Sequence, residues 1–473
     1  FFKILIFFYL IFFNNFITIN KMTIISQDKN EILPLNMPAN NEFSFAKGAS
    51  LVQFLIPQSP TLLLTKTLKL NGKLRVNRST STFSTPSFPD NINNKGTGAY
   101  SLRMNERVGL NALFDTITIS GSGSGGQTME SLRNVGRLLA LTKPLTHNQS
   151  QYDGELNGKD PTLASRSNIS AVDVNTEVFF SIPIETGLTM GVDALPLGRN
   201  GLQGMELLIQ LANDQNVLIT NEADKTSVFY SLVDLSLCYD TLSFDASTTA
   251  EMEMPKSGEL EYNSWAHQYQ VINASDTQLN LNFGTSKTLS VISSTIPTTH
   301  INNVSVDGFS TNNLLNQNAG TYNVAAPLKK VVFGKDGMRL PLEYELECEE
   351  QSTENRPRVE VIDELKGSMD VAGSSMSLVS VNTENQLKTK VNLNGDEVAS
   401  LDNTIDVQAQ NKPVFGLGIS EDSLTKVGRD FSTSTFTLRI ESGLDGNSPN
   451  SMNVFTLSKN KLVYTPQGIS VSS

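Results

Sequence analysis

The segment Phe436-Thr-Leu-Arg-Ile-Glu-Ser-Gly-Leu-Asp-Gly-Asn-Ser-Pro-Asn450 decides the fold class of this chain. Apolar and polar residues alternate strictly from Phe436 to Ile440, which predicts a β-strand with one buried face. Gly443, the pair Asp445-Gly446 and the pair Ser448-Pro449 then supply the residues that end a strand in a turn. Short strands and turn clusters of this kind follow one another along the chain, so we predict an all-β protein.

Further strand candidates lie on both sides of this segment. Leu68 and Leu70 precede Asn71-Gly72, and Leu74 and Val76 follow it, which predicts a type I′ hairpin. No period of 20 to 50 residues is visible, which disfavours a solenoid or a propeller. The other predicted strands are Ser50–Ile56, Arg107–Ser120, Val178–Ile184, Met205–Leu211, Ser227–Ser236, Tyr269–Ile272, Gln278–Phe283, Thr288–Ile292, Lys330–Phe333, Leu340–Glu347 and Asn453–Tyr464.

The length and composition predict two globular domains. The chain has 473 residues, which is too long for one ordinary core, and it is 38% hydrophobic and 18% charged, which is typical of folded proteins. A polar passage from Asp245 to Thr249 interrupts the strand pattern. We therefore place the domain boundary between residues 245 and 258, with β domains at 43–250 and 251–473 and an N-terminal arm at 22–42.

The charge and the cysteines exclude two classes of protein. Thirty-six basic against 48 acidic residues give a net charge of −12, which disfavours a broad surface for nucleic-acid phosphates. Cys238 and Cys348 lie far apart in the sequence, without partners at metal-ligand spacing. We expect two buried free thiols and neither a disulfide scaffold nor a metal site.

The first residues differ in composition from the rest. Phe1 to Asn20 consists almost entirely of Phe, Ile, Leu, Asn and Tyr, and the first methionine is Met22. We expect residues 1–21 to be translated upstream sequence that packs against nothing. A signal peptide is the alternative, but no small-x-small cleavage site follows the apolar run. No other stretch has the length of a transmembrane segment.

A glycine-rich segment formally matches a dinucleotide-binding motif. Gly121-Ser-Gly-Ser-Gly-Gly126 follows a predicted strand and precedes a predicted helix that begins with Thr128 as N-cap and carries Leu132, Val135 and Leu138 on one face. A dinucleotide site needs a second apolar strand after the helix, whereas residues 143–153 are polar. We therefore predict a connection that binds no nucleotide.

No catalytic, cofactor-binding or metal-binding residue is predicted. His147, His267 and His300 are each isolated in the sequence, and we interpret them as surface residues. Five acidic residues alternate with Tyr344, Leu346 and Cys348, which predicts one solvated strand face opposite a buried one rather than the paired carboxylates of a glycosidase. These acidic residues are Glu343, Glu345, Glu347, Glu349 and Glu350.

Four phrases of the sequence carry a resemblance to a known family. They are Leu102-Arg-Met-Asn-Glu-Arg-Val-Gly-Leu-Asn-Ala-Leu-Phe-Asp115, Thr128-Met-Glu-Ser-Leu-Arg-Asn-Val-Gly-Arg137, Phe333-Gly-Lys-Asp-Gly-Met-Arg-Leu-Pro-Leu-Glu-Tyr-Glu345, and the tail from Phe415-Gly-Leu-Gly-Ile-Ser420 through Gly468-Ile-Ser-Val471. In these phrases the chain resembles the double jelly-roll major capsid proteins of polinton-like viruses and related small double-stranded DNA viruses. The resemblance covers roughly residues 43–473 and lies in family-level phrases rather than in a catalytic signature.

The resemblance implies a structural function. It implies two tandem eight-stranded jelly-roll β-sandwiches with a few short helices, and a homotrimer that forms a pseudo-hexagonal capsomer of an icosahedral virion shell. The implied partners are neighbouring capsomers, penton proteins and other minor capsid proteins. The insertions Thr80–Gly98 and Leu365–Asn411 are candidates for tower loops or contacts between capsomers.

Two other functions remain open from the sequence. A secreted adhesin or carbohydrate-binding β-sandwich would suit an exported chain, and the sequons at Asn77, Asn148, Asn168, Asn273 and Asn303 are compatible with export. A β-scaffold glycoside hydrolase would require two carboxylates that face one cleft.

Overall fold

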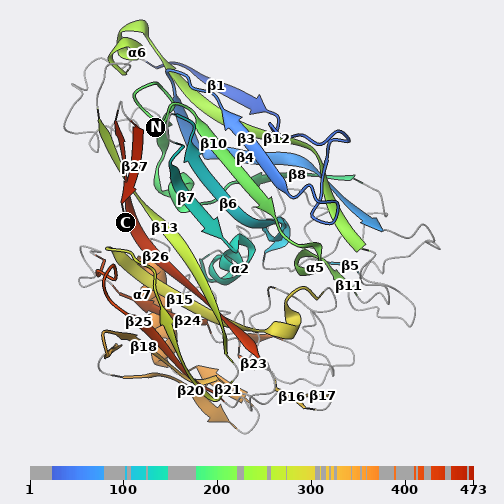
Figure 1. Cartoon of the computed structure of the whole chain (residues 1–473), viewed down its shortest axis with the longest axis vertical. Coiled ribbons are helices and arrows are strands. Elements are labelled where there is room, and N and C mark those ends of the chain that lie inside the picture. Colours follow the sequence, from blue (N-terminus) through green and yellow to red (C-terminus); the bar gives the residue numbers. More distant parts are fainter. Residues whose placement is uncertain are drawn as a thin grey trace.

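A computed structural model provides the structure of the chain, and Figure 1 shows it as a ribbon. Every structural statement below refers to the described residues. These are 24–78, 102–103, 108–123, 126–146, 177–220, 228–252, 257–272, 274–303, 309, 316–318, 321–323, 328–341, 344–351, 354–357, 359–371, 388–389, 410–411, 414–419, 428–442, 449–465 and 468–472.

Two antiparallel sheets form the first half of the fold. One sheet has the order β1-β12-β4-β8, with the short β2 on β12 and β9 on β4, and the other has the order β3-β10-β6-β7. The bounds are β1 Ile24–Ile32, β2 Glu42–Phe43, β3 Leu51–Ile56, β4 Leu62–Arg78, β6 Phe114–Gly121, β7 Thr128–Arg133, β8 Glu177–Pro183, β9 Ala194–Pro196, β10 Met205–Leu211 and β12 Val228–Phe244.

Two further sheets form the second half. Their orders are β13-β26-β15-β24, with β27 on β26, and β14-β25-β18-β20-β21, with β19 on β18. The bounds are β13 Gly258–Ile272, β14 Asp276–Leu281, β15 Thr288–Pro297, β18 Leu328–Lys335, β19 Met338–Leu340, β20 Leu346–Gln351, β21 Glu354–Pro357, β24 Val414–Gly418, β25 Phe436–Ser442, β26 Asn450–Thr465 and β27 Gly468–Ser472.

The two halves have the same topology. When the eight main strands of each half are numbered along the chain, both halves show the sheet orders 1-8-3-6 and 2-7-4-5. This order is that of a jelly roll, in which two Greek keys pack their sheets face to face. Each half also carries a helix between its fifth and sixth strands, α2 (Val135–Thr146) in the first and α7 (Val359–Val371) in the second. The predicted fold class, two tandem eight-stranded jelly rolls, is confirmed.

The remaining elements are short. The last main strand of the first half ends at Phe244, the first of the second half begins at Gly258, and α6 (Ala246–Met252) lies between them. The other helices are η2 Gly109–Leu113, α4 Gly187–Gly191, α5 Asp214–Val217 and η3 Thr298–His300, and the two-residue and three-residue strand pairs are β5 Leu102–Arg103 with β11 Ile219–Thr220, β16 Asn316–Asn318 with β17 Thr321–Asn323, and β22 Lys388–Thr389 with β23 Gln410–Asn411.

The segment interpreted as an N-terminal arm contains the first strand of the first jelly roll. β1 pairs with β12 from Ile24 opposite Phe244 to Ile32 opposite Leu237. Most of its side chains are exposed, because β1 is an edge strand of its sheet. An edge strand with a polar sequence lacks the apolar alternation that identifies a strand. Residues 1–21 and the prediction made for them lie outside the described residues.

The predicted hairpin at Asn71-Gly72 is wrong. β4 runs without interruption through these residues, and Asn71 pairs with Ser236 on one side and Ser181 on the other. Gly72 is needed for packing instead of for a turn. A Cβ atom there would lie 2.6 Å from Leu235 Cδ2 and 3.1 Å from Phe180 Cζ. Asn-Gly predicts a turn only when the flanking strands pair with each other.

The predicted helix from Thr128 is also wrong at its start. Residues 128–133 form β7, Asn134 follows with a φ of 54°, and α2 begins at Val135. The glycine-rich segment therefore joins the two strands β6 and β7, which pair with each other. A dinucleotide motif requires a strand followed by a helix, so the loop does not have the context of that motif. The spacing of Leu132, Val135 and Leu138 resembles one face of a helix, because Leu132 is buried in the strand and Val135 and Leu138 are buried in the helix.

Other strand predictions need smaller corrections. Residues 109–113 of the predicted strand Arg107–Ser120 form η2, and the predicted strand Leu340–Glu347 is interrupted between β19 and β20. Several predicted strands are longer in the structure, above all β12 and β13. Of the predicted insertions, residues 365–371 belong to α7, and residues 80–98 lie outside the described residues.

The Gly72 packing yields a stability prediction. Gly72→Ala places a methyl group against Leu235 and Phe180 and is expected to lower the free energy of unfolding by about 1–3 kcal/mol. The control Gly367→Ala lies in α7, where a Cβ meets nothing within 4 Å, and is expected to stabilise the protein slightly because alanine favours helices. Urea unfolding followed by circular dichroism measures both. Equal midpoints for Gly72→Ala and the wild type would contradict the close packing.

Candidate functional site: the junction between the two jelly rolls

A long two-stranded ribbon connects the two jelly rolls. β13 and β26 pair without a register shift from Gly258 opposite Tyr464 to Ile272 opposite Asn450. Figure 1 shows this ribbon, in yellow-green and red, passing from the second jelly roll along the first, with α2 beside it. The side chains of residues 450–458 are buried on both faces of β26. This part of β26 is therefore interior to the molecule and not on the outer surface of one domain.

The even-numbered face of the ribbon covers two different cores. At one end, Ile272, Met452 and Val454 belong to the core of the second jelly roll. Towards the other end, Tyr262 and Leu462 belong to the core cluster of the first jelly roll. The opposite face carries Phe455, which also packs into that first cluster. The ribbon thus provides apolar side chains to both jelly rolls, and the two cores meet on it.

The solvent side of the ribbon carries two exposed ion pairs. Lys459 lies 2.5 Å from Glu261, and Lys461 lies 2.8 Å from Glu259. The hydrogen bond from Lys459 holds the pKa of Glu261 below its usual value. Exposed pairs of this kind contribute little to stability, at most about 1 kcal/mol each. They mark the face of the ribbon that neither jelly roll covers.

Glu130 is the polar centre of the junction. It lies on β7 and is 4% exposed. Its Oε1 accepts hydrogen bonds from the Gly187 backbone N–H at 3.0 Å and from Ser264 Oγ at 2.7 Å, and its Oε2 accepts from the Leu188 N–H at 2.8 Å. One carboxylate therefore joins three elements: β7, the first turn of α4 and β13. Burial raises the pKa of Glu130, and the hydrogen bonds oppose that shift.

The backbones at this point lie close together. The Tyr262 hydroxyl donates to the Met129 carbonyl oxygen, and Tyr262 is 3% exposed. A Cβ atom at Gly187 would overlap the Asn263 carbonyl group, so only glycine fits where α4 approaches β13. Burial, and next the Glu130 charge, raise the pKa of Tyr262. Because a hydrogen bond permits only a narrow range of distances between donor and acceptor, these contacts fix the position of β13 on the first jelly roll.

A second polar contact joins α2 to the ribbon. His267 on β13 lies 3.0 Å from Asn453 Oδ1 through its Nε2 atom, and Asn134, which precedes α2, lies 3.4 Å from the same nitrogen. The His267 ring packs on Phe455, with 4.6 Å between ring centroids. Burial lowers the pKa of His267 to about 4, the hydrogen bond to Asn453 opposes this, and the charges of Arg137 and Arg133 lower it further. His267 is therefore neutral at pH 7.

Amide groups join the jelly rolls at a third place. Asn302, which has a φ of 56°, accepts hydrogen bonds from Asn213 at 3.2 Å and Asn216 at 3.1 Å, and its backbone N–H donates to Asn216 Oδ1 at 2.8 Å. Nearby in the sequence, Phe309 packs on α2, where a Cβ atom at Gly136 would lie 2.6 Å from its ring. These contacts tie the connection after β15 to α5 and α2.

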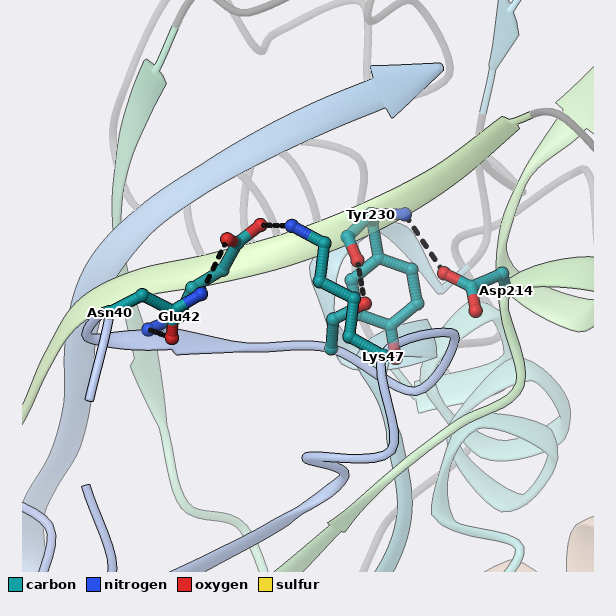
Figure 2. Close-up of polar contacts among 6 residues, drawn as sticks. Asn40, Glu42, Lys47, Asp214 and Tyr230 are labelled. Carbon is teal, nitrogen blue, oxygen red and sulfur yellow. Dashed lines mark hydrogen bonds and ion pairs between the residues drawn. The ribbon is translucent and has the colours of Figure 1, made fainter. Parts of the chain in front are cut away.

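A buried polar cluster lies within the first jelly roll, around Tyr230 (Figure 2). Asp214 Oδ1 accepts from the Tyr230 N–H at 2.8 Å, and the Tyr230 hydroxyl donates to the Ala212 carbonyl oxygen at 2.5 Å. Beside it, Glu42 accepts from Lys47 at 2.7 Å and from Asn40 at 3.1 Å. Burial raises the pKa of Asp214 to about 6, opposed by backbone hydrogen bonds. The cluster anchors residues 40–47 to β12 and α5.

The predicted surface position of the histidines is wrong for two of them. His300 is 3% exposed, and His267 is partly buried at the junction. His147 lies outside the described residues. The polar sequence neighbours of His267 gave no sign of its burial, because the residues that contact it, Asn453 and Phe455, lie on the distant strand β26.

Glu345 of the acidic segment and Cys238 have ordinary structural environments. Glu345 forms an ion pair with Lys330, whose hydrogen bond lowers the pKa of Glu345, while Leu346 is buried. Cys238 is half-buried and accepts a hydrogen bond from Asn71 at 2.9 Å. Within the described ranges, no group of three or more His, Cys, Asp or Glu residues is placed to hold a metal ion, and no helix is long and apolar enough to cross a membrane. Glu343 and the side chains of Cys348, Glu349 and Glu350 are not among those described.

Comparisons with known proteins identify the fold. The chain is similar to the capsid protein of the PBCV-1 virus capsid, with a TM-score of 0.54 and 12% identity, covering 97% of this chain and 99% of that one. It is similar to the Faustovirus major capsid protein, with a TM-score of 0.55 and 10% identity over 96% and 94% of the two chains. It is also similar to a chain of the Sputnik virophage, with a TM-score of 0.54 and 8% identity over 97% and 90%.

Sequence comparison adds no closer relative. No family model matches the chain, and no curated protein sequence matches it. The fold is therefore that of double jelly-roll major capsid proteins, and it is shared at sequence identities of 12% or less with those three structures. Both jelly rolls and the junction between them are included, because the similarity spans nearly the whole of each chain.

The junction yields a prediction for Glu130. All three of its hydrogen-bond partners are donors, so Glu130→Gln replaces one acceptor by a donor and leaves a buried N–H without an acceptor. We expect the free energy of unfolding to fall by about 1–3 kcal/mol. Glu261→Gln on the exposed side of the ribbon is the matched control and should change it by less than about 1 kcal/mol. Urea unfolding of the two variants at pH 7 makes the comparison, and equal losses would reject the central position of Glu130.

The two perturbed groups predict opposite effects of pH. Because His267 has a pKa of about 4 in the folded state and about 6.5 when unfolded, its contribution is complete above pH 6.5 and is lost as the pH falls to 4. Because Asp214 has a pKa of about 6 when folded and 3.8 when unfolded, its contribution is complete below pH 3.8 and is lost as the pH rises to 6. Each shift corresponds to about 3 kcal/mol.

Two variants separate these contributions. Relative to the wild type, His267→Gln should gain stability as the pH falls from 6.5 to 4, and Asp214→Asn should gain stability as the pH rises from 4 to 6. Other carboxylates titrate in all three proteins, so only the differences from the wild type are compared. Urea unfolding in half-unit pH steps measures them. A constant difference across this range for either variant would contradict the assigned burial.

Proposed function

We propose that the chain is a structural major capsid protein of a small double-stranded DNA virus. The observation that carries this proposal is the repetition of one jelly-roll strand order in two tandem halves, over nearly the full length of chains found in viral capsids. Proteins with a single jelly roll have many different functions, so that fold by itself is weak evidence for any one function. Two tandem jelly rolls that share the β13–β26 ribbon are an arrangement more specific to capsid proteins.

The assembled form that we propose is a homotrimer with a pseudo-hexagonal outline. Three chains with two similar jelly rolls each present six similar lateral faces, which suits the tiling of a closed shell. A three-fold ring requires a heterologous interface, in which one surface of a subunit meets a different surface of the next. Neighbouring capsomers, penton proteins and other minor capsid proteins would be the partners, and specific nucleic-acid binding is not part of the proposal.

The proposal includes no catalysis and no cofactor. Among the described residues, the buried carboxylates Glu130 and Asp214 accept hydrogen bonds from backbone N–H groups, which supports a structural role for both. The chain would reside in the capsid of the virion and assemble inside the host cell. We further propose that the two jelly rolls divide within residues 245–258, where α6 lies between β12 and β13.

Light scattering of the purified protein tests the capsomer. We expect a particle of three times the 51.7-kDa mass of the chain at micromolar concentration. The mass should change little between low and moderate salt, because an obligate interface is largely apolar and salt does not screen apolar burial. Negative-stain images should show hexagonal outlines. A monomer at all salt concentrations would reject the capsomer and favour a monomeric adhesin or carbohydrate-binding protein.

A further inference from the structure

One short strand of the second jelly roll lies against the first. β27 pairs with β26 from Lys461 opposite Ser472 to Thr465 opposite Gly468. Figure 1 shows β27, in red, alongside the first jelly roll and close to β7. β13 pairs with the same part of β26, so three strands lie side by side there. We call this part, residues 258–262, 460–465 and 468–472, the distal end of the ribbon.

The two faces of β27 differ in character. Val471 is opposite Leu462 on β26, so their side chains share one face of the sheet, and Ile469 lies two residues away on that same face. Leu462 belongs to the cluster that includes the core of the first jelly roll, and the partly buried Ile469 and Val471 pack against this cluster. Ser470 and Ser472 on the other face are exposed. The apolar face of β27 is therefore turned towards the first jelly roll.

The glycine-rich connection between β6 and β7 provides the place where Ile469 packs. Gly121 is buried at the last position of β6. A Cβ atom there would overlap Ile469 Cδ1, and it would lie 3.6 Å from Ile469 Cγ1 and 3.3 Å from the Leu202 carbonyl oxygen. A glycine in a strand often marks such a close approach of another segment. Gly121 thus leaves room for a side chain of β27.

This apolar contact lies next to the polar centre of the junction. Gly121 follows by two residues Ile119, which is opposite Glu130 on β7. Glu130 accepts a hydrogen bond from Ser264 of the ribbon, and the Tyr262 hydroxyl donates to the carbonyl oxygen of the residue before Glu130. The opposite end of the ribbon is part of the core of the second jelly roll. Contacts at the distal end therefore limit how far the two jelly rolls can move relative to each other.

We propose that β27 is a strap that holds the distal end of the ribbon on the first jelly roll, and that it opens while both jelly rolls stay folded. β27 is short, it pairs with β26 alone among the described strands, and its apolar side chains are only partly buried. Elements with few buried apolar contacts open at a lower free energy than the core strands of the same protein. An open strap leaves only the polar contacts to hold the ribbon there. The strap does not depend on the proposed capsomer.

Amide hydrogen exchange of the wild-type protein, followed by mass spectrometry, tests whether β27 opens by itself. Under native conditions we expect residues 468–472 to exchange at least about tenfold faster than residues 450–454, which are buried in the same sheet. Exchange of both segments at one common rate would mean that β27 opens only when the whole protein unfolds, and it would overturn the strap.

Variants test whether β27 holds the junction closed. Ile469→Ser with Val471→Ser removes the apolar face of β27. We expect about tenfold faster exchange in residues 186–190, where two backbone N–H groups donate to Glu130 beneath the ribbon, because a lost apolar contact shifts an opening equilibrium by roughly this factor. The control Val271→Ser changes a side chain that is 53% exposed at the opposite end of the ribbon, and it should change no rate in residues 186–190. Unchanged exchange there in the double variant, or a uniform increase throughout the protein, would overturn the strap.

A double-mutant cycle tests the fit between Ile469 and Gly121. Gly121→Ala places a methyl group where Ile469 Cδ1 lies, so it should push β27 away and speed the exchange of residues 468–472 by about tenfold. Ile469→Val removes that Cδ1 atom and is expected to have a smaller effect alone. Together the two changes should exchange more slowly than Gly121→Ala alone, because the overlap is relieved. Effects that simply add would show that β27 does not rest on Gly121 and would overturn the strap.

Discussion

The structure depends on the burial of both faces of β26, the inner strand of the β13–β26 ribbon. A strand at the surface of a sandwich needs one apolar face, but residues 450–458 of β26 are buried on both. Met452 and Val454 fill the core of the second jelly roll, and Phe455 on the other face belongs to the continuous cluster that includes the core of the first. Separation of the two jelly rolls would expose these side chains to water at a cost of roughly 25 cal/mol per Å² of apolar surface. The halves therefore form one body.

Polar groups determine how the halves sit on each other. Apolar surfaces alone are non-directional, so they allow neighbouring registers of the ribbon against β7 and α2. Glu130, the Tyr262 hydroxyl and the His267–Asn453 contact are satisfied together in one register. In any other, a buried carboxylate or hydroxyl would lose its donors or acceptors, at a cost of about 1–3 kcal/mol for each group. These residues specify one register of the ribbon, and this explains why a carboxylate and a histidine are buried at the junction.

The strands that the sequence predicted best are those with one buried and one exposed face. Met205–Leu211 matches β10 residue for residue, and Phe436–Ile440 lies within β25. The errors occurred where the surroundings of a segment differ from a half-buried sheet. β1 is an exposed edge strand. Gly72 lies where a neighbouring leucine and phenylalanine approach the backbone. Residues 128–138 form a strand and then the start of a helix, and both elements have buried apolar side chains. In each place the pattern reflects contacts with residues distant in the sequence.

The sequence by itself determined that the chain is all-β and that it holds two sandwiches. These follow from local alternation and turn residues, which depend on neighbours two to five positions away. Only the tertiary structure decided that both halves have the same strand order and that β13 and β26 belong to two cores. It also decided that Glu130 and His267 lie at the junction. The physical reason is that the hydrogen-bond partners of Glu130 and the partner Asn453 of His267 are 57 to 186 positions away, beyond what any local pattern encodes.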